Sequence, residues 1–175
     1  MKKVLVTLMV CIAVACFAEE KRRDDEKASR SEETQHKWRD LERKNADEKA
    51  SWSEDFVACQ ELAKKTGKPI FALFTGSDWC IWCKRLEGEV LSKDEFLKYA
   101  GRKLILFKAD FPSKIPQLDE LKRQNENLQR KYGIRGYPTV LLLDKNGEII
   151  GKTGYQKGGP EKYVEHIKKL IKDDK

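Results

Sequence analysis

The chain has 175 residues, of which 37% are charged and 39% hydrophobic, and its formal net charge is +7. This length accommodates one domain of about 100–150 residues with further segments outside it. The five cysteines are too few for a small scaffold held together mainly by disulfides, so the fold must rest on a hydrophobic core. What each cysteine does then depends on where it lies in the chain.

The first 18 residues have the pattern of a secretory signal peptide. Lys2 and Lys3 precede an almost wholly apolar run from Val4 to Ala18, shorter than the roughly 20 residues that span a bilayer. We expect cleavage after Ala18 and a periplasmic or secreted protein. The alternatives are an uncleaved membrane anchor, or cleavage before Cys16 with a lipid attached to that cysteine. In each case the mature thiols meet oxidising conditions.

Residues 19–50 are rich in charge and poor in apolar side chains. Ten lysines and arginines are offset by eleven acidic residues, and Trp38 and Leu41 are the large apolar residues. Such a segment cannot form a core, so we expect a flexible spacer or a solvated helix. A coiled coil would need repeated apolar positions. Nucleic-acid binding would need a basic stripe, whereas the charges here alternate in sign.

The pattern of a globular domain extends over residues 51–175. Phe56, Cys59 and Ala63 recur at helical spacing, and we expect Cys59 to be a buried, inert thiol. The continuous apolar run at 70–75 predicts a strand that is buried on both faces.

A turn follows this strand, and a second helix is predicted to begin near Cys80. Ser92 and Glu95 have the spacing of a capping box and predict the start of another short helix. The later elements expected are a buried strand at 104–109, a polar helix at 116–131, a hairpin of strands 139–143 and 148–152 around Asn146-Gly147, and an amphipathic helix from Pro160.

We expect Leu118, Leu121, Leu128 and Tyr132 on one side of the polar helix, and His166 on the surface of the last helix. The order of helices and strands predicts an α/β fold, with a central mixed β-sheet flanked by helices on both faces.

Cys80 and Cys83 are the candidate catalytic residues. The strand and turn before them place Cys80 at a helix N-terminus, where unpaired N–H groups and the helix dipole favour a thiolate. Cysteines in such motifs have pKa values of about 3.5–7.5. Cys83 lies one turn along the helix and can attack a mixed disulfide formed at Cys80. We therefore expect Cys80 to be the exposed nucleophile and Cys83 the buried resolving thiol.

Two other uses of this cysteine pair were considered. A structural zinc ion needs four ligands, and the mature chain adds only Cys59, His36 and His166, at unsuitable spacings. A purely structural disulfide is possible, although so short a loop constrains the unfolded chain little. We expect no metal and no organic cofactor, because the cysteine pair would itself be the redox-active group.

Two motifs resemble those of the thioredoxin superfamily. One is FTGSDWCIWCK at 74–84, and the other is KYGIRGYPT at 131–139, whose Gly-Tyr-Pro-Thr is similar to the family's cis-proline loop. The resemblance covers about residues 52–172. It implies a thioredoxin fold, a redox-active Cys80–Cys83 disulfide and a cis peptide bond before Pro138. It also implies thiol–disulfide exchange with protein substrates.

The resemblance also suggests a substrate site. The family uses the backbone just before the proline to hold an extended substrate strand, a form of β-pairing, so Tyr137 and Pro138 are expected at the substrate groove. Trp79 precedes Cys80, and Trp82 lies between the two cysteines. We expect Trp79 to pack beside the disulfide, and Trp82 to be either a substrate-facing aromatic or a partly exposed cap.

The chain departs from the family pattern at several positions. Ile81-Trp82 stands where thioredoxin has Gly-Pro and where strong oxidants have a histidine, so an extreme oxidant is disfavoured. Leu73 and Leu106 align with thioredoxin's buried acid and its nearby lysine. The long stretch at 111–130 is more similar to exported bacterial thioredoxin-like proteins related to the DsbD family.

The sequence thus predicts a monomeric, exported thiol–disulfide oxidoreductase that acts on protein substrates and has a redox partner protein. The alternative is a non-catalytic binding module of the same fold, whose cysteine pair is only a structural disulfide. We expect no nucleic-acid binding, and contact with a membrane only through a lipid on Cys16 or an uncleaved signal.

Overall fold

The structure is a computed structural model that describes residues 50–172. The predicted signal peptide at 1–18, and all but the last residue of the predicted spacer at 19–50, lie outside these residues. No helix in the described part of the chain is long and apolar enough to cross a membrane.

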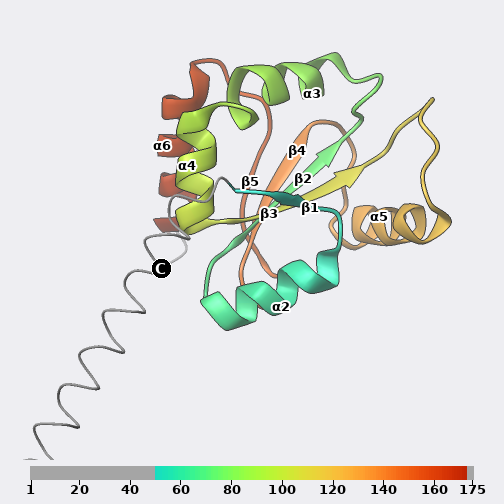
Figure 1. Cartoon of the computed structure of the whole chain (residues 1–175), viewed down its shortest axis with the longest axis horizontal. Helices are drawn as coiled ribbons and strands as arrows, with labels where there is room; N and C mark the ends of the chain where they lie inside the picture. Colours follow the sequence, from blue (N-terminus) through green and yellow to red (C-terminus); the bar gives the residue numbers. More distant parts are fainter. Residues whose placement is uncertain (1–49, 173–175) are drawn as a thin grey trace, which may run out of the picture. The chain divides into compact units, whose positions relative to one another are not determined.

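The strands form one mixed sheet in the order β1–β3–β2–β4–β5 (Figure 1). Their bounds are β1 (Trp52–Ser53), β2 (Ile70–Thr75), β3 (Ile105–Asp110), β4 (Thr139–Leu143) and β5 (Ile149–Thr153). Both β1 and β2 run parallel to β3, whereas β4 is antiparallel to β2 and to β5. The two-residue strand β1 was not predicted, because two residues carry no detectable alternation.

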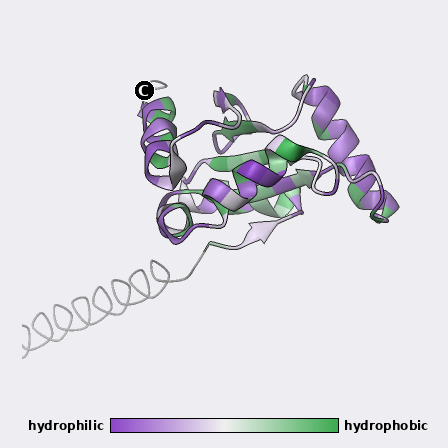
Figure 2. Cartoon of the chain, turned by 90° about the horizontal axis from the view of Figure 1, so that it is seen from above, coloured by the Kyte–Doolittle hydropathy of each residue, from purple (hydrophilic) through white to green (hydrophobic). Residues whose placement is uncertain are grey.

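Helices cover both faces of this sheet. They are α2 (Phe56–Thr66), α3 (Ile81–Leu86), the π-helix η1 (Glu87–Leu91) that continues α3, α4 (Asp94–Lys103), α5 (Asp119–Lys131) and α6 (Gly159–Lys172). One core lies between the sheet and α2 and α5, and the other between the sheet and α3, η1, α4 and α6. Figure 2 shows the hydrophobic sheet between helices with hydrophilic outer faces. The predicted α/β architecture is confirmed.

The central strand β2 supplies side chains to both cores. Phe71 and Leu73 point to one core, and Ile70, Ala72 and Phe74 to the other, each of them with 2% exposure or less. A strand covered on both faces has no side that needs polar residues. This explains why β2 reads as a continuous apolar run, with the bounds that the sequence predicted.

The helix expected from residue 116 begins at Asp119 instead. Leu118 is its N-cap and has extended backbone angles of φ −60° and ψ 138°. Leu118 is 79% exposed, so it does not share a side with the buried Leu128, contrary to the prediction. The polar Asn125 is buried in this helix, with 1% exposure.

The capping box predicted at Ser92 and Glu95 is wrong as well. The Ser92 N–H donates to the Glu87 carbonyl at 3.0 Å, which is the wider hydrogen-bond spacing of the π-helix. Helix α4 therefore starts one residue later, with Lys93 as an N-cap that makes no side-chain cap bond. Ser92 therefore ends the preceding helix η1 and does not cap the start of α4.

The remaining expectations have mixed outcomes. Cys59 is buried, with 2% exposure, as expected. The hairpin forms around Asn146-Gly147, where Gly147 has φ +85°. His166 is half-buried instead of lying on the surface, because its Nε2 is 3.0 Å from the Thr153 hydroxyl on β5.

Asn125 ties α5 to the end of β3, and its loss should destabilise the fold. Its Nδ2 donates to the Asp110 carbonyl at 2.9 Å. We expect Asn125→Ala to lower the free energy of unfolding by about 1–3 kcal/mol, because the carbonyl loses its shorter partner inside the protein. Urea denaturation measures this. The exposed Asn127 of the same helix is the control, and Asn127→Ala should change stability by less than about 0.5 kcal/mol. Equal effects would contradict the role given to Asn125.

Candidate active site

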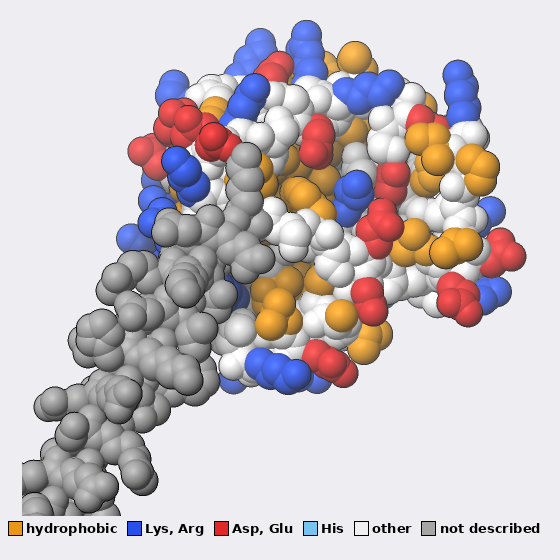
Figure 3. Space-filling model, viewed as in Figure 1, with side chains coloured by type: hydrophobic (Ala, Val, Ile, Leu, Met, Phe, Trp, Pro, Cys, Tyr) orange, Lys and Arg blue, Asp and Glu red, His pale blue; other side chains and the backbone are white. Residues whose placement is uncertain are grey.

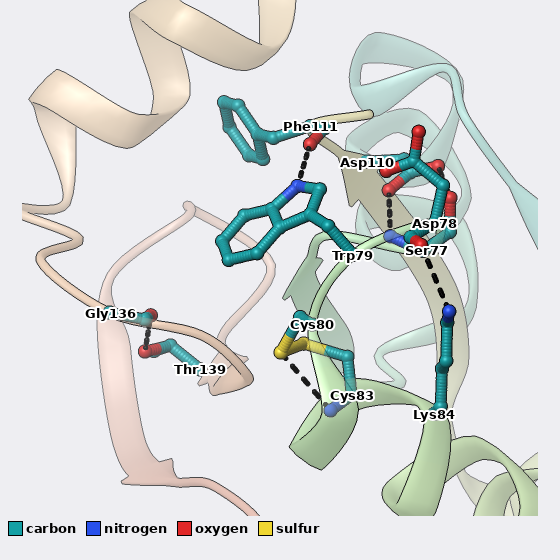
Figure 4. Close-up of a disulfide and its surroundings, with 10 residues drawn as sticks. All are labelled: Ser77, Asp78, Trp79, Cys80, Cys83, Lys84, Asp110, Phe111, Gly136 and Thr139. Atoms are coloured by element: carbon teal, nitrogen blue, oxygen red, sulfur yellow. Dashed lines mark hydrogen bonds between the residues drawn. A yellow bond between two sulfur atoms is a disulfide. The ribbon is translucent and has the colours of Figure 1, made fainter. Parts of the chain in front are cut away.

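A disulfide joins Cys80 and Cys83 at the start of α3 (Figure 4). Cys80 is the N-cap of this helix, with extended backbone angles of φ −82° and ψ 108°. The Cys83 N–H donates to the Cys80 Sγ at 3.2 Å. A hydrogen bond to sulfur at a helix N-terminus favours the thiolate once the disulfide is reduced.

Both cysteines are buried in this oxidised state. Cys80 is 6% exposed and Cys83 is 4% exposed, so the expectation of an exposed Cys80 is wrong here, while the burial of Cys83 is confirmed. Figure 4 shows the Trp79 indole on one side of the sulfur atoms and the segment from Gly136 to Thr139 on another.

The turn before Cys80 is held by the end of β3. The Ser77 N–H and hydroxyl donate to the Asp110 carboxylate at 2.9 and 2.5 Å. The Trp79 Nε1 donates to the Phe111 carbonyl at 2.8 Å. Two residues of the turn, Ser77 and Trp79, thus bind the last residue of β3 and the residue after it, which fixes where Cys80 enters α3.

An aromatic cluster lies beside the disulfide. The Trp79 ring meets Tyr137 edge-on at 5.7 Å, and Tyr137 packs against Phe111 at 5.3 Å. The Tyr137 hydroxyl accepts a hydrogen bond from Gln129 at 2.6 Å, and burial raises the pKa of this tyrosine. The peptide bond between Tyr137 and Pro138 is cis. The structure therefore brings Trp79 and Tyr137 together next to the cysteines.

Trp82 belongs to a separate aromatic group. Its ring lies 5.3 Å from Tyr155, and the Arg85 guanidinium lies 5.0 Å above it. The Tyr155 hydroxyl donates to the Glu89 carboxylate at 2.6 Å. Tyr155 and Phe111 were not predicted as site residues, because each lies far in sequence from the cysteines.

The alignment with thioredoxin predicted Leu106 as the neighbour of Leu73, and this prediction is wrong by two residues. Leu73 pairs with Lys108 on β3, whereas Leu106 pairs with Phe71. A shift of two residues keeps the same strand faces, so alternation alone could not detect it. A lysine therefore does lie beside Leu73. The charge of this lysine also acts on Glu87 of η1. Burial raises the pKa of Glu87, and the positive charge of Lys108 counteracts this rise.

The described residues offer no metal centre. Among residues 50–172, no group of three or more His, Cys, Asp or Glu side chains is arranged to hold a metal ion. Cys59 lies in the core between the sheet and α2 and α5, where burial raises the pKa of its thiol.

Residues 58–171 match the family described as the thioredoxin-like domain. The chain belongs to the thioredoxin-like family. It is 34% identical over 119 residues to the disulfide bond reductase DsbH of Chlamydia pneumoniae, covering 68% of this chain and 72% of that protein. It is 28% identical over 103 residues to the thioredoxin-related protein DsbJ of Chlamydia pneumoniae, covering 59% of this chain and 30% of that protein.

A solved structure of a DsbH oxidoreductase has the same fold, with a TM-score of 0.69. The match is 33% identical and covers 73% of this chain and 88% of that chain. The thioredoxin fold is thereby confirmed. The enzyme class of this family member is that of its relatives, a thioredoxin-like thiol–disulfide oxidoreductase.

Gly76 should not tolerate a side chain. A Cβ there would overlap the Trp79 indole, with Cζ2 and Nε1 at 2.6 Å. We expect Gly76→Ala to displace the indole and break its bond to the Phe111 carbonyl, which would shift the Trp79 indole N–H signal in an NMR spectrum and slow disulfide reduction. A Cβ on Gly88 meets nothing within 4 Å, so Gly88→Ala is the control. An unshifted Trp79 signal in Gly76→Ala would contradict the prediction.

Proposed function

We propose that this protein is an exported disulfide reductase that passes two electrons from its Cys80–Cys83 dithiol to disulfides of protein substrates. The observation that carries the proposal is the Cys80–Cys83 disulfide at a helix N-cap, with an N–H donated to the Cys80 sulfur. The direction is supported by the name of the DsbH relative, a disulfide bond reductase.

The reaction would begin from the reduced pair. The Cys80 thiolate attacks one sulfur of the substrate disulfide, so a mixed disulfide forms and the first substrate thiolate leaves. The Cys83 thiol loses its proton and attacks the Cys80 sulfur. This step forms the Cys80–Cys83 bond and releases the second substrate thiolate. Two electrons have moved to the substrate, and its two sulfurs have taken up two protons.

A dithiol donor must then reduce the disulfide again. In an oxidising compartment we propose that this donor is a partner protein, which attacks the Cys80–Cys83 bond and is itself oxidised to a disulfide. Export is proposed from the signal-like pattern of residues 1–18. The enzyme would work as a monomer.

The substrate would lie against the segment that contains the cis-proline. No hydrogen bond within residues 50–172 uses the backbone N–H or carbonyl of Tyr137, so both groups are free to pair with an extended chain. Pro138 follows directly, and Trp79 and Trp82 are 49% and 46% exposed around the disulfide. These four residues are the proposed substrate-binding set.

Cysteine variants separate this enzyme from a binding module with a structural disulfide. We expect wild-type protein to reduce insulin with dithiothreitol as donor, and Cys80→Ser to lose this activity because the attacking thiolate is gone. Cys83→Ser should accumulate the mixed disulfide, which mass spectrometry detects as a covalent adduct. Full insulin reduction by Cys83→Ser would contradict the two-cysteine mechanism. For a reductase, the reduction potential of the pair should lie nearer to about −270 mV than to about −120 mV.

Alkylation of the reduced protein tests whether Cys80 is an activated thiolate. We expect iodoacetamide at pH 7 to modify Cys80 at least about tenfold faster than Cys59, because a thiolate is the reactive species. Cys59 is the control in the same chain, since burial raises its pKa and covers its thiol. Peptide mass spectrometry gives both rates. If Cys80 reacts no faster than a free cysteine in an unstructured peptide, the proposed activation is wrong.

A further inference from the structure

The connection between β3 and α5, residues 111–118, presents apolar side chains to solvent next to the disulfide. Ile115 is 56% exposed and Leu118 is 79% exposed, and Trp79 beside this connection is 49% exposed. Figure 3 shows hydrophobic side chains gathered at the surface in the region where, in Figure 1, the chain leads into α5. Single exposed apolar residues need no explanation, but a group of them next to a reactive site marks an interaction surface.

The Asp78 carboxylate holds the middle of this connection. It accepts hydrogen bonds from the backbone N–H groups of Ser113 at 3.0 Å, Lys114 at 2.6 Å and Ile115 at 3.3 Å. Successive N–H groups of this kind form a concave nest for an anion, and here the anion is the protein's own side chain. These bonds keep the pKa of Asp78 below its usual value. Asp78 stands two residues before Cys80, so it couples the connection to the active-site turn.

The ends of the connection are held separately. The Phe111 N–H donates to the Thr75 carbonyl at 2.9 Å, and its carbonyl accepts from Trp79. The Gln117 side chain donates to the Asp110 carbonyl at 3.2 Å. Asp78 therefore is not needed to attach the connection to the domain. Its hydrogen bonds with the N–H groups of residues 113–115 instead determine the path of these residues, and therefore the position of Ile115.

We propose that Asp78 is a positioning residue that presents Ile115 and Leu118 to protein substrates. The occupant of this surface would be an extended substrate segment with apolar side chains next to its disulfide. The proposal rests on the reductase function proposed above. It is favoured because the connection begins at Phe111, which packs against Tyr137 at 5.3 Å and whose carbonyl accepts a hydrogen bond from the Trp79 indole beside the sulfur atoms, so the connection is continuous with the proposed substrate site.

The test compares three disulfides. One is a cystine peptide flanked by Leu and Phe, the second is the same peptide flanked by Ser, and the third is 2-hydroxyethyl disulfide. We expect Asp78→Asn, Ile115→Ser and Leu118→Ser each to raise KM for the apolar peptide by about tenfold, which corresponds to the loss of one buried apolar contact. The value of kcat for this peptide, and both constants for the other two disulfides, should stay within about twofold of wild type.

Matched controls come from the far end of β4. The Asp144 carboxylate also accepts backbone N–H groups, from Asn146 and Glu148, both at 2.8 Å. Ile149 is 47% exposed, similar to Ile115. Asp144→Asn and Ile149→Ser should leave both constants unchanged for all three disulfides, although they remove the same kinds of groups.

Three results would overturn the proposal. The first is an unchanged KM for the apolar peptide in all three variants. The second is a fall in kcat of the same size for every disulfide, which would place Asp78 in the chemistry instead of in substrate docking. The third is a dimer in sedimentation that Ile115→Ser dissociates, since the surface would then bind a second copy of this chain.

Failure of the underlying function gives a different pattern. If wild-type protein reduces none of the three disulfides, the reductase function itself is wrong. Circular dichroism shows whether Asp78→Asn has folded. If that variant is unfolded, Ile115→Ser and Leu118→Ser decide the proposal alone, because their exposed side chains make no core contacts.

Discussion

Asp110, the last residue of β3, accepts hydrogen bonds through its carboxylate from Ser77 and through its carbonyl from Asn125. One residue thus joins the central sheet, the active-site turn and α5. β3 lies between β1 and β2, and its end at Asp110 pairs with Thr75 of β2, whereas β1 reaches only Leu106 and Phe107. The position of the disulfide, and of the connection that Asp78 holds, depends on this anchored strand end.

The helix that begins at the cysteines, α3 with its continuation η1, has a side buried in the core and an exposed first turn. Leu86 and Val90 have 0% exposure and pack in the core with α4 and α6. Ile81, between the two cysteines, is 64% exposed. The helix is therefore fixed by its buried side, while its first turn stays available for a partner. This arrangement allows thiol–disulfide exchange without movement of the core, because only the Cys80–Cys83 bond and the surrounding side chains must rearrange.

Much of the fold could be predicted because local patterns agreed with the final packing. The apolar runs of β2 and β4 have the predicted bounds, and each forms a strand covered on both faces. Predictions failed at helix starts. The Ser92 N–H donates to the Glu87 carbonyl and continues the preceding helix, so the predicted capping box does not form. The helix expected from residue 116 begins only at Asp119, after the extended residue Leu118.

The sequence by itself determined the class of fold and the place of Cys80 and Cys83 at a helix start, because helical periodicity, apolar runs and turn residues encode helices, strands and their ends. The proline loop followed from the resemblance to the thioredoxin superfamily. Only the tertiary structure decided which residues surround the disulfide. It paired Leu73 with Lys108, brought Tyr137 to Trp79 and joined Asp78 to residues 113–115. Such contacts depend on strand register and on connections between distant elements. A two-residue shift or a loop path changes them while leaving the local pattern intact.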